Sequence, residues 1–88
     1  MKFHPIGTVV LLSGGTKPLM IYGRRQIHGD SKKLWDYVAC LYPEGNISPE
    51  YNVFFQHVEI EKVLYFGYIT SSEEEIEPKL HMHVNMSV

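Results

Sequence analysis

The chain has 88 residues, of which 44% are hydrophobic and 20% are charged. This length and composition fit one globular domain and leave no room for a second one. Seven glycines and five prolines are too few for a collagen-like, low-complexity or disordered chain. Composition therefore predicts a single small folded domain, but it assigns no activity to it.

The formal net charge of −2 is distributed unevenly along the chain. Residues 1–33 hold six basic residues and one acidic residue, a net +5, whereas residues 34–88 hold two basic and nine acidic residues, a net −7. The whole chain has no overall attraction for nucleic acid or anionic lipid. Cys40 is the single cysteine, so no intrachain disulfide can form, and the apolar stretch Val9–Leu12 is too short for a signal peptide or a membrane span. We therefore expect a cytoplasmic protein without a membrane anchor.

The first two predicted elements form a β-hairpin. Thr8–Leu12 is an apolar, β-branched stretch between turn residues, which is typical of a buried strand. Leu19–Tyr22 is the second predicted strand, and it can continue to Ile27. Gly14 and Gly15 supply the loop chemistry between the two strands. The short connection predicts antiparallel pairing.

Three more strands are predicted in the middle of the chain. Leu34–Tyr42 is rich in aromatic and β-branched residues, and apolar side chains fall on both of its faces. Residues 48–49, Ser-Pro, are an N-cap followed by an N1 proline and predict one helical turn. Val53–Gln56 and Lys62–Ile69 are the fourth and fifth predicted strands. His57–Ile60, between them, is too short for an α-helix and suits a single 3₁₀ turn.

The order of these elements predicts the fold class and the domain boundaries. Five strands with a short turn before the last one indicate a mainly β protein, a small SH3-like barrel over residues 1–70. Residues 71–88 form a C-terminal extension. Ser71 and Ser72 are each followed by a Glu three residues later, which predicts a capping box and a short acidic turn. Apolar and polar residues then alternate through 79–88, which predicts an extra strand that can close the domain's own sheet or pair with a second copy in a homodimer.

The candidate motifs for chemistry are weak. Gly14-Gly15-Thr16-Lys17 lacks the Gly-Lys-Ser/Thr order of a phosphate-binding loop. Cys40 lies in mid-strand among apolar residues, where a cysteine is usually a small buried hydrophobe. His81 and His83 would point the same way from a strand, but two ligands are too few for a metal. We therefore predict no catalytic residue, no cofactor and no metal, and hence a protein that is not an enzyme.

The aromatic residues suggest two ways of binding a partner. Aromatic side chains are enriched in protein interfaces, so the leading hypothesis is a non-enzymatic protein-binding module. The alternative is a small barrel that binds nucleic acid through a basic aromatic face, although the acidic second half of the chain opposes it. The expected protein-binding anchors are Trp35, Tyr37, Tyr51 and Tyr68, and the alternative uses Arg24, Arg25 and Trp35.

Three collinear segments carry a family resemblance. They are PIGTVVLLSGGTKPLMIYGR (Pro5–Arg24), DYVACLYPEGN (Asp36–Asn46) and FFQHVEIEKVLYFGY (Phe54–Tyr68), and the cluster Glu73–Glu75 follows the last one. Together they resemble the domain of unknown function 4176 family of small Gram-positive bacterial proteins. The resemblance implies a setting in type VII secretion loci, near LXG-domain toxins, and a cytoplasmic accessory, targeting or chaperone-like role for such a toxin or another secretion component. No catalytic residues are established for that family, so the resemblance implies none here. Residues 76–88 fall outside it.

Overall fold

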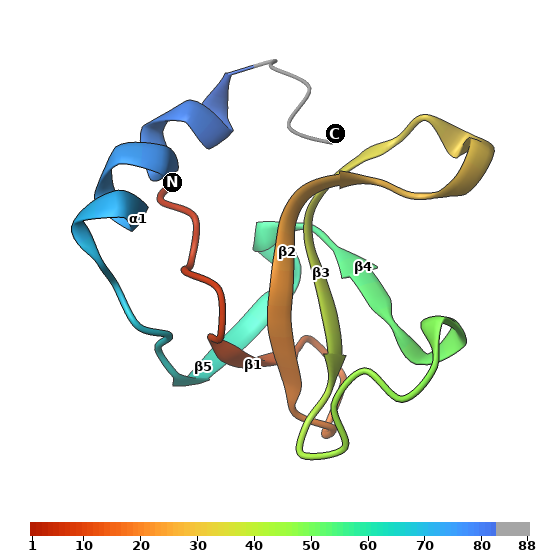
Figure 1. Cartoon of the computed structure of the whole chain (residues 1–88). Helices are drawn as coiled ribbons and strands as arrows, with labels where there is room; N and C mark the ends of the chain where they lie inside the picture. The colour runs from red at the N-terminus through yellow and green to blue at the C-terminus, as the bar shows by residue number, and fades with distance from the viewer. Residues whose placement is uncertain (83–88) are drawn as a thin grey trace.

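Five antiparallel strands form one sheet in the computed structural model, which describes residues 1–82 (Figure 1). The strand order is β4-β3-β2-β1-β5, so β4 and β5 each have a single neighbour and the sheet is open. The mainly β architecture is confirmed, whereas the closed barrel is not formed. The strands are β1 (Val9–Leu12), β2 (Leu19–Ile27), β3 (Leu34–Leu41), β4 (Val53–Phe55) and β5 (Ile60–Tyr65).

Short helical elements connect and extend the strands. The single 3₁₀ turn predicted between β4 and β5 is confirmed, and a similar turn begins after Ser48 as predicted. Within residues 1–82, no helix is long and apolar enough to cross a membrane. The helical elements are η1 (Gly29–Ser31), η2 (Pro49–Tyr51), η3 (His57–Glu59), α1 (Ser71–Ile76) and η4 (Glu77–His81).

The predicted hairpin is confirmed, and the last strand is shifted from its predicted position. β1 and β2 pair antiparallel, and β2 continues to Ile27. The fifth strand was expected at Lys62–Ile69, but β5 begins at Ile60 and ends at Tyr65. Tyr65 pairs with Val9, the first residue of β1, so the neighbouring strand offers no partner beyond that point. Two register shifts along β5 show that this edge strand is bulged.

The C-terminal segment differs from the predicted strand. The cap of α1 is Thr70, whose Oγ1 accepts the N–H of Glu73 at 3.1 Å, and not Ser71 or Ser72. Residues 77–81 form the 3₁₀ helix η4 where the strand 79–88 was expected to begin. The alternating pattern is overridden here because Leu80 packs into the core beside Phe3. Residues 83–88, with the rest of that predicted strand, lie outside the described residues.

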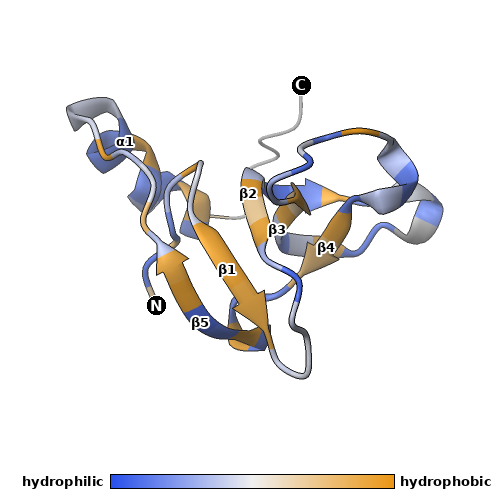
Figure 2. Ribbon diagram, turned by 90° about the horizontal axis from the view of Figure 1, so that it is seen from below, coloured by the Kyte–Doolittle hydropathy of each residue, from blue (hydrophilic) through white to orange (hydrophobic). Residues whose placement is uncertain are grey.

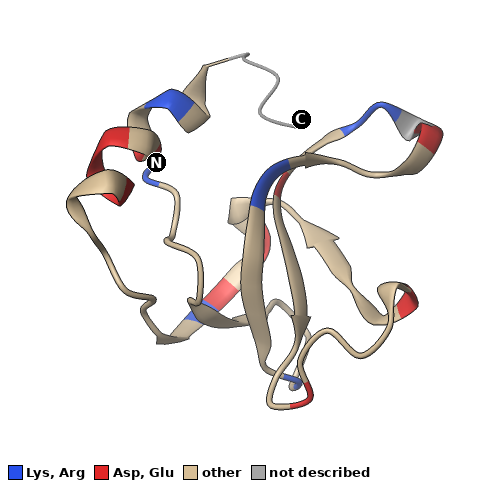
Figure 3. Cartoon of the chain, in the orientation of Figure 1, with Lys and Arg blue, Asp and Glu red and all other residues tan. Residues whose placement is uncertain are grey.

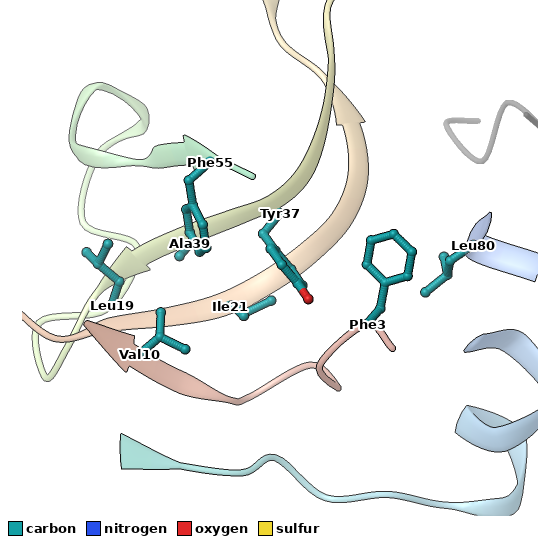
Figure 4. Close-up of a cluster of buried hydrophobic side chains, with 8 residues drawn as sticks. All are labelled: Phe3, Val10, Leu19, Ile21, Tyr37, Ala39, Phe55 and Leu80. Carbon is teal, nitrogen blue, oxygen red and sulfur yellow. The ribbon is translucent and has the colours of Figure 1, made fainter. Parts of the chain in front are cut away.

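The core joins the sheet to both ends of the described chain. Figure 4 shows Phe3 between Tyr37 of β3 and Leu80 of η4. The Phe3 and Tyr37 rings meet edge to face at 5.8 Å between centroids. Residues 71–82 therefore contribute to the same core as the sheet. The buried cluster comprises Phe3, Val10, Leu19, Ile21, Tyr37, Ala39, Phe55 and Leu80.

Candidate functional site

Tyr37 is a core residue, so its expected role as a surface anchor is wrong. It lies on β3 between Arg24 of β2 and Phe55 of β4, and its side chain is fully buried. Its hydroxyl accepts the backbone N–H of His4 at 3.0 Å and shares a hydrogen bond of 2.6 Å with Nδ1 of His57. Burial raises the pKa of Tyr37 to about 12. The residue therefore ties three segments together in its neutral form.

The other three expected anchors lie in different elements. Trp35 is half-buried on β3 with the Nζ of Lys33 4.2 Å from its ring centroid. Tyr51 is exposed in η2, and Tyr68 is 84% exposed after β5. Among residues 1–82 no ring contact links these three side chains. Of the predicted set, Tyr68 is the most exposed.

Arg24 and Arg25 do not form an exposed basic face, which corrects the alternative prediction. The Arg24 side chain is only 7% exposed, and its two terminal nitrogens donate to the Glu73 carboxylate at 2.7 and 2.8 Å. Arg25 lies 3.6 Å from the Asp36 carboxylate and over the ring of Phe3. Both guanidinium charges are compensated inside the molecule, so neither is presented to a phosphate backbone.

The residues considered for chemistry are not assembled into a reactive site. Cys40 is buried on β3 opposite Met20. Residues 14–17 lie in the β1–β2 loop. His81 lies in η4 with its Nε2 2.7 Å from the Glu77 carboxylate, and its predicted companion His83 is outside the described residues. Within residues 1–82, no group of three or more His, Cys, Asp or Glu residues could hold a metal ion.

The candidate site is an exposed apolar stretch at the end of β5, which we call the apolar run. Phe66 is 61% exposed and Tyr68 is 84% exposed, and their neighbours are also open to solvent. Such a group of large apolar side chains on one short segment is a common mark of a binding surface. The sequence placed this segment in a strand, which hid its exposure. The apolar run consists of Leu64, Tyr65, Phe66, Tyr68 and Ile69.

Gly67 explains why the side chains of the run are uncovered. Its backbone N–H donates to Oγ1 of the buried Thr8 at 3.0 Å. A Cβ at Gly67 would overlap the carbonyl oxygen of Ile6, so the backbone approaches residues 6–8 too closely for any other residue type. The main chain at Gly67 thus faces the protein, and the flanking Phe66 and Tyr68 side chains are exposed.

The apolar run contributes to two hollows of different chemistry. The acidic cleft, of about 250 Å³, lies between the N-terminal segment, the run and α1. The apolar hollow, of about 370 Å³, lies over β1, β2 and β5 and has no charged lining residue. The acidic cleft is lined by Lys2, Phe3, His4, Pro5, Phe66, Ile69, Glu73, Glu74 and Glu77. The apolar hollow is lined by Gly7, Val9, Pro18, Met20, Tyr42, Leu64 and Tyr65.

Most of the ionisable groups of the acidic cleft are already engaged. Glu73 pairs with Arg24. Burial acts to raise the pKa of Glu77, but hydrogen bonds from the Phe3 N–H at 2.8 Å and from His81 outweigh it and hold that pKa below its usual value. Burial and the nearby His57 lower the pKa of His4. These groups therefore fix the walls of the cleft, and Figure 3 shows acidic residues in red along α1.

The free edges of the sheet are poorly suited to adding a strand. β4 is only three residues long. β5 is bulged twice and exposes Glu61 and Lys62 in its middle, which Figure 2 shows as a hydrophilic band. Short, bulged and charged edges disfavour pairing with another chain. The apolar run and its hollows are thus the better candidate surface than a sheet edge.

Comparison with known proteins gives a family. No curated protein and no solved structure matches the chain. The model of the family described as a domain of unknown function, DUF4176, matches residues 3–76, which include the five strands, the apolar run and α1. On that match over most of its length, the chain belongs to the DUF4176 family.

Proposed function

We propose that this protein is a non-enzymatic binding module that recognises another protein through the apolar run. The observation that carries the proposal is the exposure of five large apolar residues on a single short segment, with a hollow beside each end. Aromatic residues that lie next to pockets are typical energetic centres of protein interfaces. The run is held in place by Gly67 and Thr8, so a partner meets a preformed surface.

The biological setting of the proposal comes from the family. We propose a cytoplasmic accessory, targeting or chaperone-like factor for an LXG-domain toxin of a type VII secretion system in a Gram-positive bacterium. Membership of the DUF4176 family supports this setting. A factor of this kind would bind its toxin before export, which requires an exposed recognition surface and no catalytic group.

We also propose that the sheet is an open form of the SH3-like barrel. The strand order supports this relationship, since β1 pairs with both β2 and the final strand β5. The 3₁₀ helix η3 lies directly before β5, as in the predicted element order. In such a fold the loops and the ends of strands carry the binding residues, which agrees with a site at the end of β5.

The proposal is tested by co-purification with LXG-domain proteins encoded in the same genome. We expect the double substitution Phe66→Ser/Tyr68→Ser to weaken capture by about 30-fold or more, because even one interface anchor typically contributes at least about 2 kcal/mol. The matched control is Ile47→Ser/Val58→Ser, which removes two exposed apolar side chains that neither belong to the run nor line either hollow. Equal capture by both double variants, or a captured partner that nuclease releases, would overturn the proposal.

A further inference from the structure

The two hollows beside the apolar run differ in charge, and this difference indicates what the partner carries. The apolar hollow has no charged lining residue, whereas three glutamates and one lysine line the acidic cleft. The walls contributed by Pro5, Phe66 and Ile69 are apolar. A group that fills this cleft must therefore combine an apolar stem with a polar end.

One carboxylate of the cleft is left without a partner. Glu73 is bound by Arg24, and Glu77 accepts hydrogen bonds from Phe3 and His81. Glu74 lies exposed on α1, and within residues 1–82 its carboxylate has no ion pair or side-chain hydrogen bond. Lys2, the one lysine of the lining, acts on Glu77, whose pKa its charge helps to lower. An exposed, uncompensated carboxylate thus lines the cleft together with its apolar walls.

Lysine and arginine side chains match this arrangement. Both have an apolar stem that packs along hydrophobic walls and a cationic end that stays near water. An exposed aromatic ring such as Phe66 also attracts a cation over its face. A carboxylate or phosphate group would instead be repelled by Glu74, while the charge of Lys2, the one lysine of the lining, already acts on Glu77. Charge complementarity therefore selects a cation as the occupant.

We propose that the acidic cleft receives a lysine or arginine side chain of the partner protein, next to apolar partner residues that lie on the apolar run. This inference rests on the proposed protein-binding function and adds the chemistry of the partner segment to it. The recognised segment is then cationic and apolar in alternation, and acidic segments are rejected.

The probe for the test is the peptide acetyl-Leu-Arg-Leu-amide, titrated into the full chain and followed by NMR. Its matched control replaces arginine by citrulline, which has nearly the same shape and no charge. We expect saturable shifts of the Phe66, Ile69 and Glu74 signals, with the arginine peptide binding about three-fold more tightly than the citrulline peptide. Equal affinities, or shifts that avoid the cleft, would overturn the inference.

Two protein variants test whether the preference for the arginine peptide arises in the acidic cleft. We expect Glu74→Gln to abolish the difference between the two peptides, while Glu75→Gln leaves it unchanged. Glu75 is the adjacent exposed carboxylate of α1 and does not line the cleft, so it controls for general charge effects. The same loss in both variants would show a diffuse attraction and overturn the inference. Cleft signals that move with protein concentration alone would assign the cleft to a second copy, which also overturns it.

The outcomes separate this inference from the proposed function. Toxin capture that depends on Phe66 and Tyr68 but shows no arginine preference in the cleft leaves the binding module intact and removes the cationic partner. Conversely, arginine selectivity in the cleft without any captured protein would refute the proposed protein-binding function. It would leave the preference of the cleft for a cation intact.

Discussion

Two groups of Phe and Tyr residues in this protein have opposite environments. Phe3, Tyr37 and Phe55 are buried in the core, and the Tyr37 hydroxyl has two partners inside the protein. Phe66 and Tyr68, at the end of β5, are mostly exposed. The difference lies in the surroundings: Tyr37 on β3 is flanked by two paired strands and the Phe3 and Phe55 rings pack against it, whereas the chain after Tyr65 has lost its strand partner. Aromatic residues thus stabilise the fold in one region and remain exposed to solvent in the other.

Truncating one member of each group gives the largest expected contrast. Tyr37→Ala leaves a cavity in the core and removes a buried hydroxyl, so we expect a loss of about 3–5 kcal/mol in the free energy of unfolding. Tyr68→Ala removes only exposed surface, and we expect a change within about 0.5 kcal/mol. Urea denaturation of the two variants beside the wild type measures both values. Similar losses in the two variants would contradict the division into core and surface groups.

The Arg24–Glu73 ion pair connects the buried aromatic group to the acidic cleft. Arg24 lies opposite Tyr37 in the sheet, and Glu73 lines the cleft. We expect Arg24→Met to destabilise the fold by about 3 kcal/mol, because Glu73 is left largely buried and uncompensated. The double variant Arg24→Met/Glu73→Leu removes both charges and should recover most of that loss. Lys17→Met, which breaks an exposed ion pair with Glu44, is the control and should leave the denaturation midpoint unchanged. No recovery in the double variant would argue against a charge effect.

Removing a single oxygen sharpens the comparison further. Tyr37→Phe keeps the ring in the core but leaves the His4 N–H and His57 Nδ1 without their partner. We expect a loss of about 1–2 kcal/mol, the usual cost of unsatisfied buried polar groups. Tyr51→Phe removes an exposed hydroxyl and serves as the matched control. If both variants keep wild-type stability in urea, the Tyr37 hydroxyl does not tie these segments together.

The smallest expected effect is a pH dependence that originates from His4. Its pKa in the folded protein is lowered from 6.5, so the unfolded chain binds a proton that the folded protein rejects. Stability should therefore fall as the pH drops below 6.5 towards the folded pKa of His4, and it should not depend on this group above 6.5. We expect His4→Asn to flatten this slope in urea denaturation measured across that range. His28→Asn, at an exposed histidine, should retain it.

Local patterns predicted much of the fold. The Gly14-Gly15 loop and the apolar stretches around it were sufficient to place the first hairpin, and the short segment before β5 was recognised as a 3₁₀ turn. The sheet's open edges and the 3₁₀ helix η4 were not predictable in this way. The alternation around Leu80 is a local signal, whereas its burial against Phe3 depends on a contact between residues distant in sequence.

The candidate site was harder to predict than the fold. Tyr68, one of the expected anchors, is exposed, but Tyr37 was placed on the surface because an aromatic residue in a strand gives no sign of which face is covered. Arg24 and Arg25 suggested a basic face, and only the structure shows that Glu73 and Asp36 compensate them. The signal for the apolar run was present in six consecutive residues, Leu64–Ile69, with no charged residue among them. The exposure of this stretch could not be read from it, because it follows from the position of Val9: β1 begins there, so the chain has no strand partner beyond Tyr65.

The bulged and charged edge of β5 has a consequence for the behaviour of the protein at high concentration. An uncovered apolar surface next to a regular sheet edge would invite chains to stack strand upon strand into aggregates. Glu61, Lys62 and the two bulges prevent that growth at β5, and the brevity of β4 limits it at the other end. The molecule can therefore leave its apolar run open to solvent without offering a regular sheet edge from which fibrils could grow.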